Sequence, residues 1–148
     1  MTRDVLATPG YLTSVAARGF VRLSEARLKP LGFGVGTVPV LTALRDGRAD
    51  TQAELARVLR VGQPPMAQML ARMERDGLVR RTPDPSDGRS RKVELTKLAE
   101  ARLPDALATL FEGNRQATRG FTDEEARQFV GFLERVIANL DQMSDDAA

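Results

Sequence analysis

Apolar residues recur at helical spacing over most of the chain, and this spacing changes to a period of two only once. Positions three and four apart predict amphipathic helices over residues 10–28, 37–46, 51–59, 64–76, 97–112 and 122–143. After Gly77 alternate residues become apolar, which predicts strands at 78–82 and 91–95. Asp87-Gly88 between them is typical of a hairpin turn. The predicted fold is therefore mainly α with a small antiparallel β-hairpin.

Capping and breaking residues indicate where the helices begin and end. Thr37 can cap the second helix, while Thr51 with Glu54 and Thr122 with Glu125 have the spacing of capping boxes. Pro104 predicts a kink or a delayed start near Leu103, because proline cannot donate the backbone hydrogen bond of a helix interior. The stretch GNRQATRG predicts a connection before the last helix, and the tail from residue 144 is expected to fray.

The helices at 51–59 and 64–76 are short and are joined by a turn at Val61-Gly62, which predicts a helix-turn-helix. The second of them has two distinct faces. Its methionine-rich face is interpreted as core (Met66, Met69, Leu70, Met73). Its other face is polar or small (Gln63, Pro65, Ala67, Gln68, Arg72, Arg75). Gln and Arg can hydrogen-bond base edges or phosphates, so this face is a candidate for reading the DNA major groove.

Basic residues are concentrated around this helix and the hairpin. Residues 57–92 contain nine Arg or Lys and four acids, a local net charge of +5 in a chain whose total is +2. Such a basic region is the usual footprint of a polyanion partner. Arg89 lies near the hairpin tip, from which an arginine can enter the narrow, most negative part of a minor groove. Phosphate contacts are expected from Arg80, Arg81, Arg91 and Lys92.

Composition excludes several other function classes. The chain has 148 residues, enough for one domain with a core, and it contains no Cys and no His. Thiol redox chemistry, disulfides, imidazole or thiolate metal ligands and His-activated nucleophiles are therefore excluded. No stretch has the length of a membrane span and no signal peptide is recognisable, so a cytoplasmic protein is expected. The acids Glu54 and Asp87 have local structural explanations, and we expect neither an enzyme nor a cofactor.

The stretch LARVLRVGQPPMAQMLARMERDGLVRRTPDPSDGRSRKVELT, preceded by LKPLGF, resembles the MarR family of winged helix-turn-helix transcriptional regulators. The resemblance covers about residues 10–140, and its specific part is 51–96. The D-x-R-S form between G-L-V and L-T carries most of it. One departure is Ala67, where many relatives have Ser or Thr and which leaves only apolar contact with a base, such as a thymine methyl.

The resemblance implies an obligate homodimer with three parts in each chain: an N-terminal dimerisation helix (1–34), a winged helix-turn-helix (35–96) and C-terminal dimerisation helices (97–148). It implies that Gln63, Pro65, Ala67, Gln68 and Arg72 face double-stranded DNA, with Arg89 as the wing-tip arginine and Asp87 holding it in place. Family members are commonly repressors of a pseudo-palindromic operator, relieved by a small aromatic or lipophilic effector. Such an effector would bind between the first helix, the second helix and the helix after the wing, where Phe20, Phe33 and Phe111 are candidates for its pocket.

Two alternatives to this function stay open on the sequence. A winged helix can contact a protein partner instead of DNA, and the charge of the exposed helix and wing is the feature that separates the two. A regulator can also act without any ligand, in which case the three phenylalanines are ordinary core residues.

Overall fold

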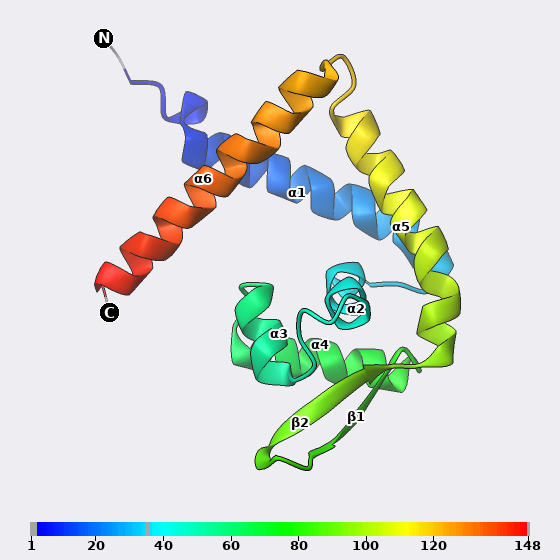
Figure 1. Ribbon diagram of the computed structural model, residues 1–148. Coiled ribbons are helices and arrows are strands. Elements are labelled where there is room, and N and C mark those ends of the chain that lie inside the picture. Colours follow the sequence, from blue (N-terminus) through cyan, green and yellow to red (C-terminus); the bar gives the residue numbers. More distant parts are fainter. Residues whose placement is uncertain (1–2, 35, 148) are drawn as a thin grey trace. The chain divides into compact units, whose positions relative to one another are not determined.

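A computed structural model describes residues 3–34 and 36–147, except for the side chains of residues 87–90. The described helices and strands, with two short 3₁₀ turns, confirm the predicted class of a mainly helical fold with one hairpin (Figure 1). Their bounds are η1 Val5–Ala7, α1 Pro9–Leu28, η2 Lys29–Leu31, α2 Thr37–Arg45, α3 Gln52–Val58, α4 Gln63–Arg75, β1 Val79–Asp84, β2 Asp87–Leu95, α5 Lys97–Ala117 and α6 Asp123–Ala147.

The chain divides into two compact units, Met1–Gly113 and Asn114–Ala148, and the boundary falls inside α5. The first unit contains the hydrophobic core, to which the end of α1, the helices α2 to α4, the root of the hairpin and the start of α5 all contribute. All of these elements therefore share one core. The division into dimerisation and DNA-binding parts remains a prediction about function.

The turn between α3 and α4 spans residues 59–62 and differs from the expected glycine turn. Gly62 has φ −62°, an ordinary value, and serves as the N-cap of α4. The residue with positive φ is Arg60, at 54°. The backbone N–H of Val61 donates to the carbonyl of Ala56 over 2.9 Å, which closes the end of α3. A non-glycine residue in this conformation carries a cost of roughly 1 kcal/mol, which the packing of two short helices must offset.

Two of the predicted helix starts have a different geometry. Thr37 is the first residue of α2 and not its cap, because its hydroxyl donates to the carbonyl of Gly34 over 2.6 Å while Gly36 occupies the cap position. At α3 the hydroxyl of Thr51 accepts from the backbone of Glu54 at 3.2 Å, as predicted. The Glu54 carboxylate accepts from that hydroxyl at 3.3 Å, instead of reaching back to the cap amide.

The hairpin strands are antiparallel, with Arg81 opposite Val93 and Asp84 opposite Asp87. The turn therefore lies at Pro85-Ser86, and the prediction of a turn at Asp87-Gly88 was wrong because that dipeptide begins β2. The Asp84 carboxylate accepts from the backbone N–H and the hydroxyl of Ser86, at 2.9 and 2.7 Å. These two hydrogen bonds lower the pKa of Asp84 and replace the glycine-based turn.

Helix α5 begins at Lys97 and runs through Pro104 without a break, so of the two expected outcomes, a kink or a delayed start, the delayed start was wrong. The flanking residues Leu103 and Ala106 are fully buried, and their burial offsets the backbone hydrogen bond that proline cannot make. The helix also continues to Ala117, which shortens the predicted connection to residues 118–122.

Helix α6 extends to Ala147 and includes the tail that was expected to fray. Its predicted capping box is confirmed, because Thr122 and Glu125 each donate a backbone N–H to the other's side chain, at 2.8 and 3.1 Å. In its own unit none of its residues is buried, although it carries an apolar stripe. Within the described residues, no helix is both long and apolar enough to cross a membrane.

Candidate nucleic-acid interface

Helix α4 presents the two faces that the sequence predicts. Met66, Leu70 and Met73 are each no more than 1% exposed. Met69 is half-buried and lies against the backbone at Gly36. On the opposite side the polar and small residues are exposed, apart from the half-buried Ala67 (Gln63, Pro65, Gln68, Arg72, Arg75). The buried side fixes the rotation of the helix, so the exposed side is a preformed surface that does not need to refold to meet a ligand.

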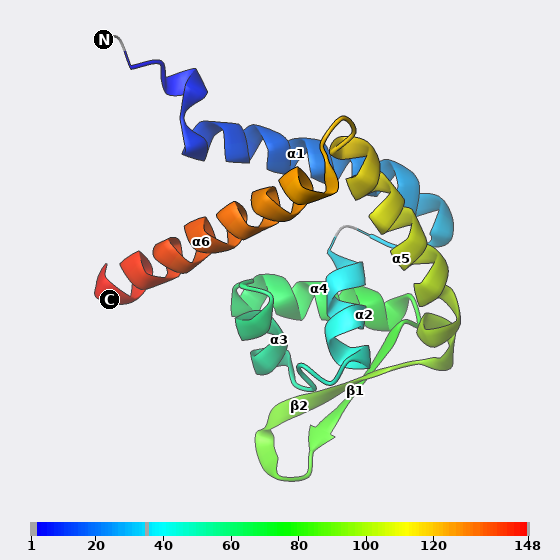
Figure 2. The same cartoon turned by 45° about the horizontal axis from the view of Figure 1, so that its top comes forward.

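Figures 1 and 2 show the hairpin extending from the end of α4 past the helices α3 and α4. Its root is fixed by hydrogen bonds from Leu78, just before β1, and from Thr96, just after β2. Leu78 donates to the carbonyl of Met73 at 2.9 Å, and the hydroxyl of Thr96 donates to the carbonyl of Gly77 at 2.6 Å. Helix α4 and the hairpin are therefore joined at a firmly bonded corner.

The basic side chains of the hairpin that are predicted to contact phosphates differ in their ion pairs. Arg80 is paired with Glu94 at 3.4 Å and is 65% exposed. Lys92 lies 4.0 Å from the carboxylate of Asp50 and is also open to solvent. Arg91 is exposed, and the structure gives it no ion pair with any described residue. Arg80, Lys92 and Arg91 are thus available to a polyanion, two of them after releasing an acid.

Arg81 is held more tightly. Its side chain is only 18% exposed, and its Nη2 donates to Oε1 of Glu74 at 3.3 Å. Its backbone N–H donates to Oε2 of the same carboxylate at 3.1 Å. The two hydrogen bonds from Arg81 lower the pKa of Glu74 below its ordinary value. The Nε of Arg81 is buried and has no partner in the described part of the chain.

Two further residues predicted to meet DNA lie where the structure describes only the backbone. Asp87 and Arg89 are part of β2, and their side chains fall outside the described residues. The assignment of Arg89 to a minor groove, with Asp87 holding it, stays a prediction. Sequence reasoning missed Glu74, Glu94 and Asp50, the acids that pair with the hairpin cations; an acid in the last turn of a helix before an arginine-rich strand is the signal that points to Glu74.

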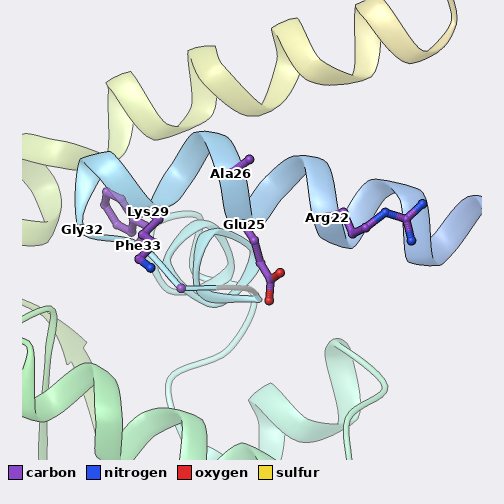
Figure 3. A pocket seen from close by; sticks show the side chains of 7 residues that line it. Arg22, Glu25, Ala26, Lys29, Gly32 and Phe33 are labelled. Atoms are coloured by element: carbon purple, nitrogen blue, oxygen red, sulfur yellow. The ribbon is translucent and has the colours of Figure 1, made fainter.

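A cavity of about 780 Å³ lies beside the end of α1. Figure 3 shows its lining: Arg22, Glu25 and Ala26 on α1, Lys29 at the start of η2, and Gly32 with Phe33 just after η2. Of the three candidate phenylalanines only Phe33 is among its described lining residues, whereas Phe20 is half-buried elsewhere and Phe111 is 65% exposed. The described residues contain no group of three or more acids that could hold a metal ion.

The geometry matches one known group of proteins. A model of the MarR family matches residues 31–90, which span the helix-turn-helix and most of the hairpin. The chain carries the MarR-family winged helix. A MarR transcriptional regulator from Methanosarcina mazei Go1 is 26% identical with a TM-score of 0.80, over 90% of this chain and 96% of that one.

Two other MarR structures extend the comparison. A mutant MarR from E. coli complexed with operator DNA is 26% identical, with a TM-score of 0.80 over 90% of this chain and 99% of that chain. A MarR-family regulator from Rhodococcus sp. RHA1 is 20% identical with a TM-score of 0.82, over 91% and 96% of the two chains, and shows the shared fold alone. Within the matched fold, helix α4 occupies the position of the recognition helix of a winged helix and the β1–β2 hairpin that of the wing, and we use these two names for them.

Proposed function

We propose that this chain is a sequence-specific DNA-binding transcriptional regulator that acts as a homodimeric repressor at a pseudo-palindromic operator. The observation that carries the proposal is the exposed face of α4, where Gln63, Gln68 and Arg72 stand on a helix whose other side is buried. The E. coli MarR of the same fold is complexed with operator DNA, which supports the same partner here. Arg91 and the wing-tip Arg89 would add phosphate and minor-groove contacts.

The dimer is proposed from apolar residues that have no cover within their own unit. In the first unit Leu6, Leu12 and Val15 are exposed on η1 and α1. In the second unit the exposed apolar residues follow the helical repeat along α6 (Val130, Val136, Ile137, Leu140). An exposed apolar stripe of this length marks an interaction surface. Two copies, each presenting one recognition helix, would reach successive major grooves roughly 34 Å apart.

Relief by a small aromatic or lipophilic effector is proposed for the cavity beside α1. Phe33 borders the cavity although only 2% of it is exposed, and Arg22 and Lys29 supply positive charge beside the carboxylate of Glu25. An effector can loosen DNA binding only if it prefers a dimer geometry in which the recognition helices are wrongly spaced. A thermal-shift screen with aromatic acids tests this part. No shift with any compound would favour the ligand-independent regulator.

Selection of bound sequences from a random DNA pool, with the purified protein, tests the main proposal. We expect a two-fold symmetric motif whose half-sites are one helical turn apart. Enrichment of nothing above background would favour the alternative, a winged helix that binds a protein partner. The concentration of arginine on the helix and wing supports DNA over that alternative.

A further inference from the structure

The wing is clamped on both of its edges at neighbouring positions of its ladder. Glu74 accepts from the backbone and side chain of Arg81 on the outer edge of β1. On the other edge the backbone N–H of Val93 donates to the carbonyl of Asp50 at 2.7 Å, and Thr51 forms a bridge with Lys92. Because Arg81 is paired with Val93, both clamps act at one level of the hairpin.

The two clamps differ in kind. The Asp50 contact is made by backbone and continues the sheet by one bridge, so it tolerates side-chain changes. The Glu74 contact is made by a single carboxylate that uses both oxygens, one for the strand backbone and one for a guanidinium. Arg81 has a poorly exposed side chain, so its charge faces the end of α4 and not open solvent. A pair between a half-buried guanidinium and a carboxylate fixes direction as well as distance.

We propose that Glu74 and Arg81 are positioning residues that set the direction of the wing relative to the recognition helix, and that Arg81 does not serve as a phosphate contact. This inference rests on the proposed DNA-binding function. Beyond the level of Arg81 the hairpin runs on to its turn at Pro85-Ser86, so a small rotation at the clamp is multiplied at the tip. Loss of the clamp therefore changes where the wing meets DNA.

Whether Glu74→Gln tightens or weakens DNA binding distinguishes a positioning role from simple neutralisation of an arginine. Glu74→Gln and Glu94→Gln each remove one negative charge beside a wing arginine, and each leaves a side chain of the same shape. If both acids only neutralise arginines, both variants bind operator DNA more tightly. We expect Glu94→Gln to tighten binding by up to about fivefold and Glu74→Gln to weaken it by about tenfold, the loss of one charge-assisted hydrogen bond. Tighter binding by Glu74→Gln would overturn the proposal.

A double-mutant cycle with Arg89 reports on the wing tip. Arg89→Ala should weaken the otherwise unchanged protein by about tenfold or more and should cost little once Glu74 is already Ala, because the misdirected wing no longer delivers the tip. Additive losses in the two variants would contradict a positioning role. Melting temperatures of all variants, measured in parallel, separate misdirection from unfolding.

The direction of the wing relative to α4 can also be measured in the free protein, without DNA. The chain has no cysteine, so two labels can be attached cleanly after Gln68→Cys on α4 and Pro85→Cys at the hairpin turn. Labelled chains are diluted into unlabelled ones, so that each dimer reports a distance within one chain. We expect a narrow distance distribution that broadens with Glu74→Ala and stays narrow with Glu94→Gln. An unchanged distribution in Glu74→Ala would refute the clamp whether or not DNA binds, while broadening without any DNA binding would refute only the proposed function.

Discussion

The recognition helix α4 and the wing both carry arginine, but they hold it in opposite ways. On α4 the structure gives Arg72 and Arg75 no ion pair with a described residue, and the helix is fixed from behind by buried Leu70. On the wing Arg80 and Arg81 are each paired with an acid. A count of charges therefore overstates the cations that the wing offers to DNA, whereas the helix offers fewer cations, each with no acid to displace.

The largest expected effect is on the free energy of unfolding and concerns Leu70, the buried residue that packs α4 against the core. Leu70→Ala should lower the free energy of unfolding by about 2–5 kcal/mol, because a fully buried side chain leaves a cavity behind it. Gln68→Ala, on the exposed face of the same helix, should change it by less than about 0.5 kcal/mol. Urea unfolding of both variants measures the difference. Equal losses would mean that the two faces of α4 are not distinct.

The next effect is on operator binding and compares an arginine of α4 with an arginine of the wing. Arg72→Ala should weaken operator binding by about 1–3 kcal/mol if its guanidinium reaches a base or phosphate. Arg80→Ala should cost less, because Arg80 must first leave Glu94, and an exposed pair of this kind is worth up to about 1 kcal/mol. Titration of labelled operator at one salt concentration compares them. A larger loss for Arg80 would reverse the contrast between helix and wing.

Sequence periodicity predicted the helix better than the wing, for a physical reason. The 3.6-residue period reports which side of a helix is buried, so Met66, Leu70 and Met73 were placed correctly in the core. The turn at Asp87-Gly88 was inferred from a local preference, but the ladder register places the turn at Pro85-Ser86. Propensity is a weak guide where tertiary pairing decides.

The remaining differences arise from contacts between residues distant in sequence. Glu74 and Arg81 are separated by a helix end and a turn, and no periodic pattern marks a pair across such a corner. Pro104 satisfies the rule for a helix break, yet the burial of Leu103 keeps α5 continuous. The composition of the chain likewise could not show that Phe33 lines the cavity beside α1 while Phe111 is exposed.

Salt dependence sharpens the contrast within the wing itself. Each neutralised phosphate contributes about 0.9 to the slope of log affinity against log salt, so Arg91→Ala should reduce the slope of a dimer by about 1.8. Arg80→Ala should reduce it by less, because that guanidinium is paired with Glu94 and lies outside the clamp. Affinities measured over a salt series give both slopes. Equal reductions would show that Arg80 leaves Glu94 for a phosphate when DNA binds.

The smallest effect is the response of the wing clamp to acid. The hydrogen bonds from Arg81 lower the pKa of Glu74 in the folded protein, so the folded state favours the ionised carboxylate more than the unfolded chain does. The resulting stability is fully present above the ordinary pKa of 4.5 and is lost as pH falls through the lower folded-state pKa.

Glu74→Gln lacks this carboxylate, so its melting temperature should be below that of the unsubstituted chain near neutral pH. The two melting temperatures should converge as pH falls from 4.5 through the lower folded-state pKa, because the carboxyl of Glu74 is then neutral in the folded protein as well. Asp84 has a lowered pKa too, from its hydrogen bonds to Ser86, but it is present in both proteins and its effect cancels in the difference. A gap that stayed constant into strong acid would show that the ionised form of Glu74 contributes nothing to holding the wing.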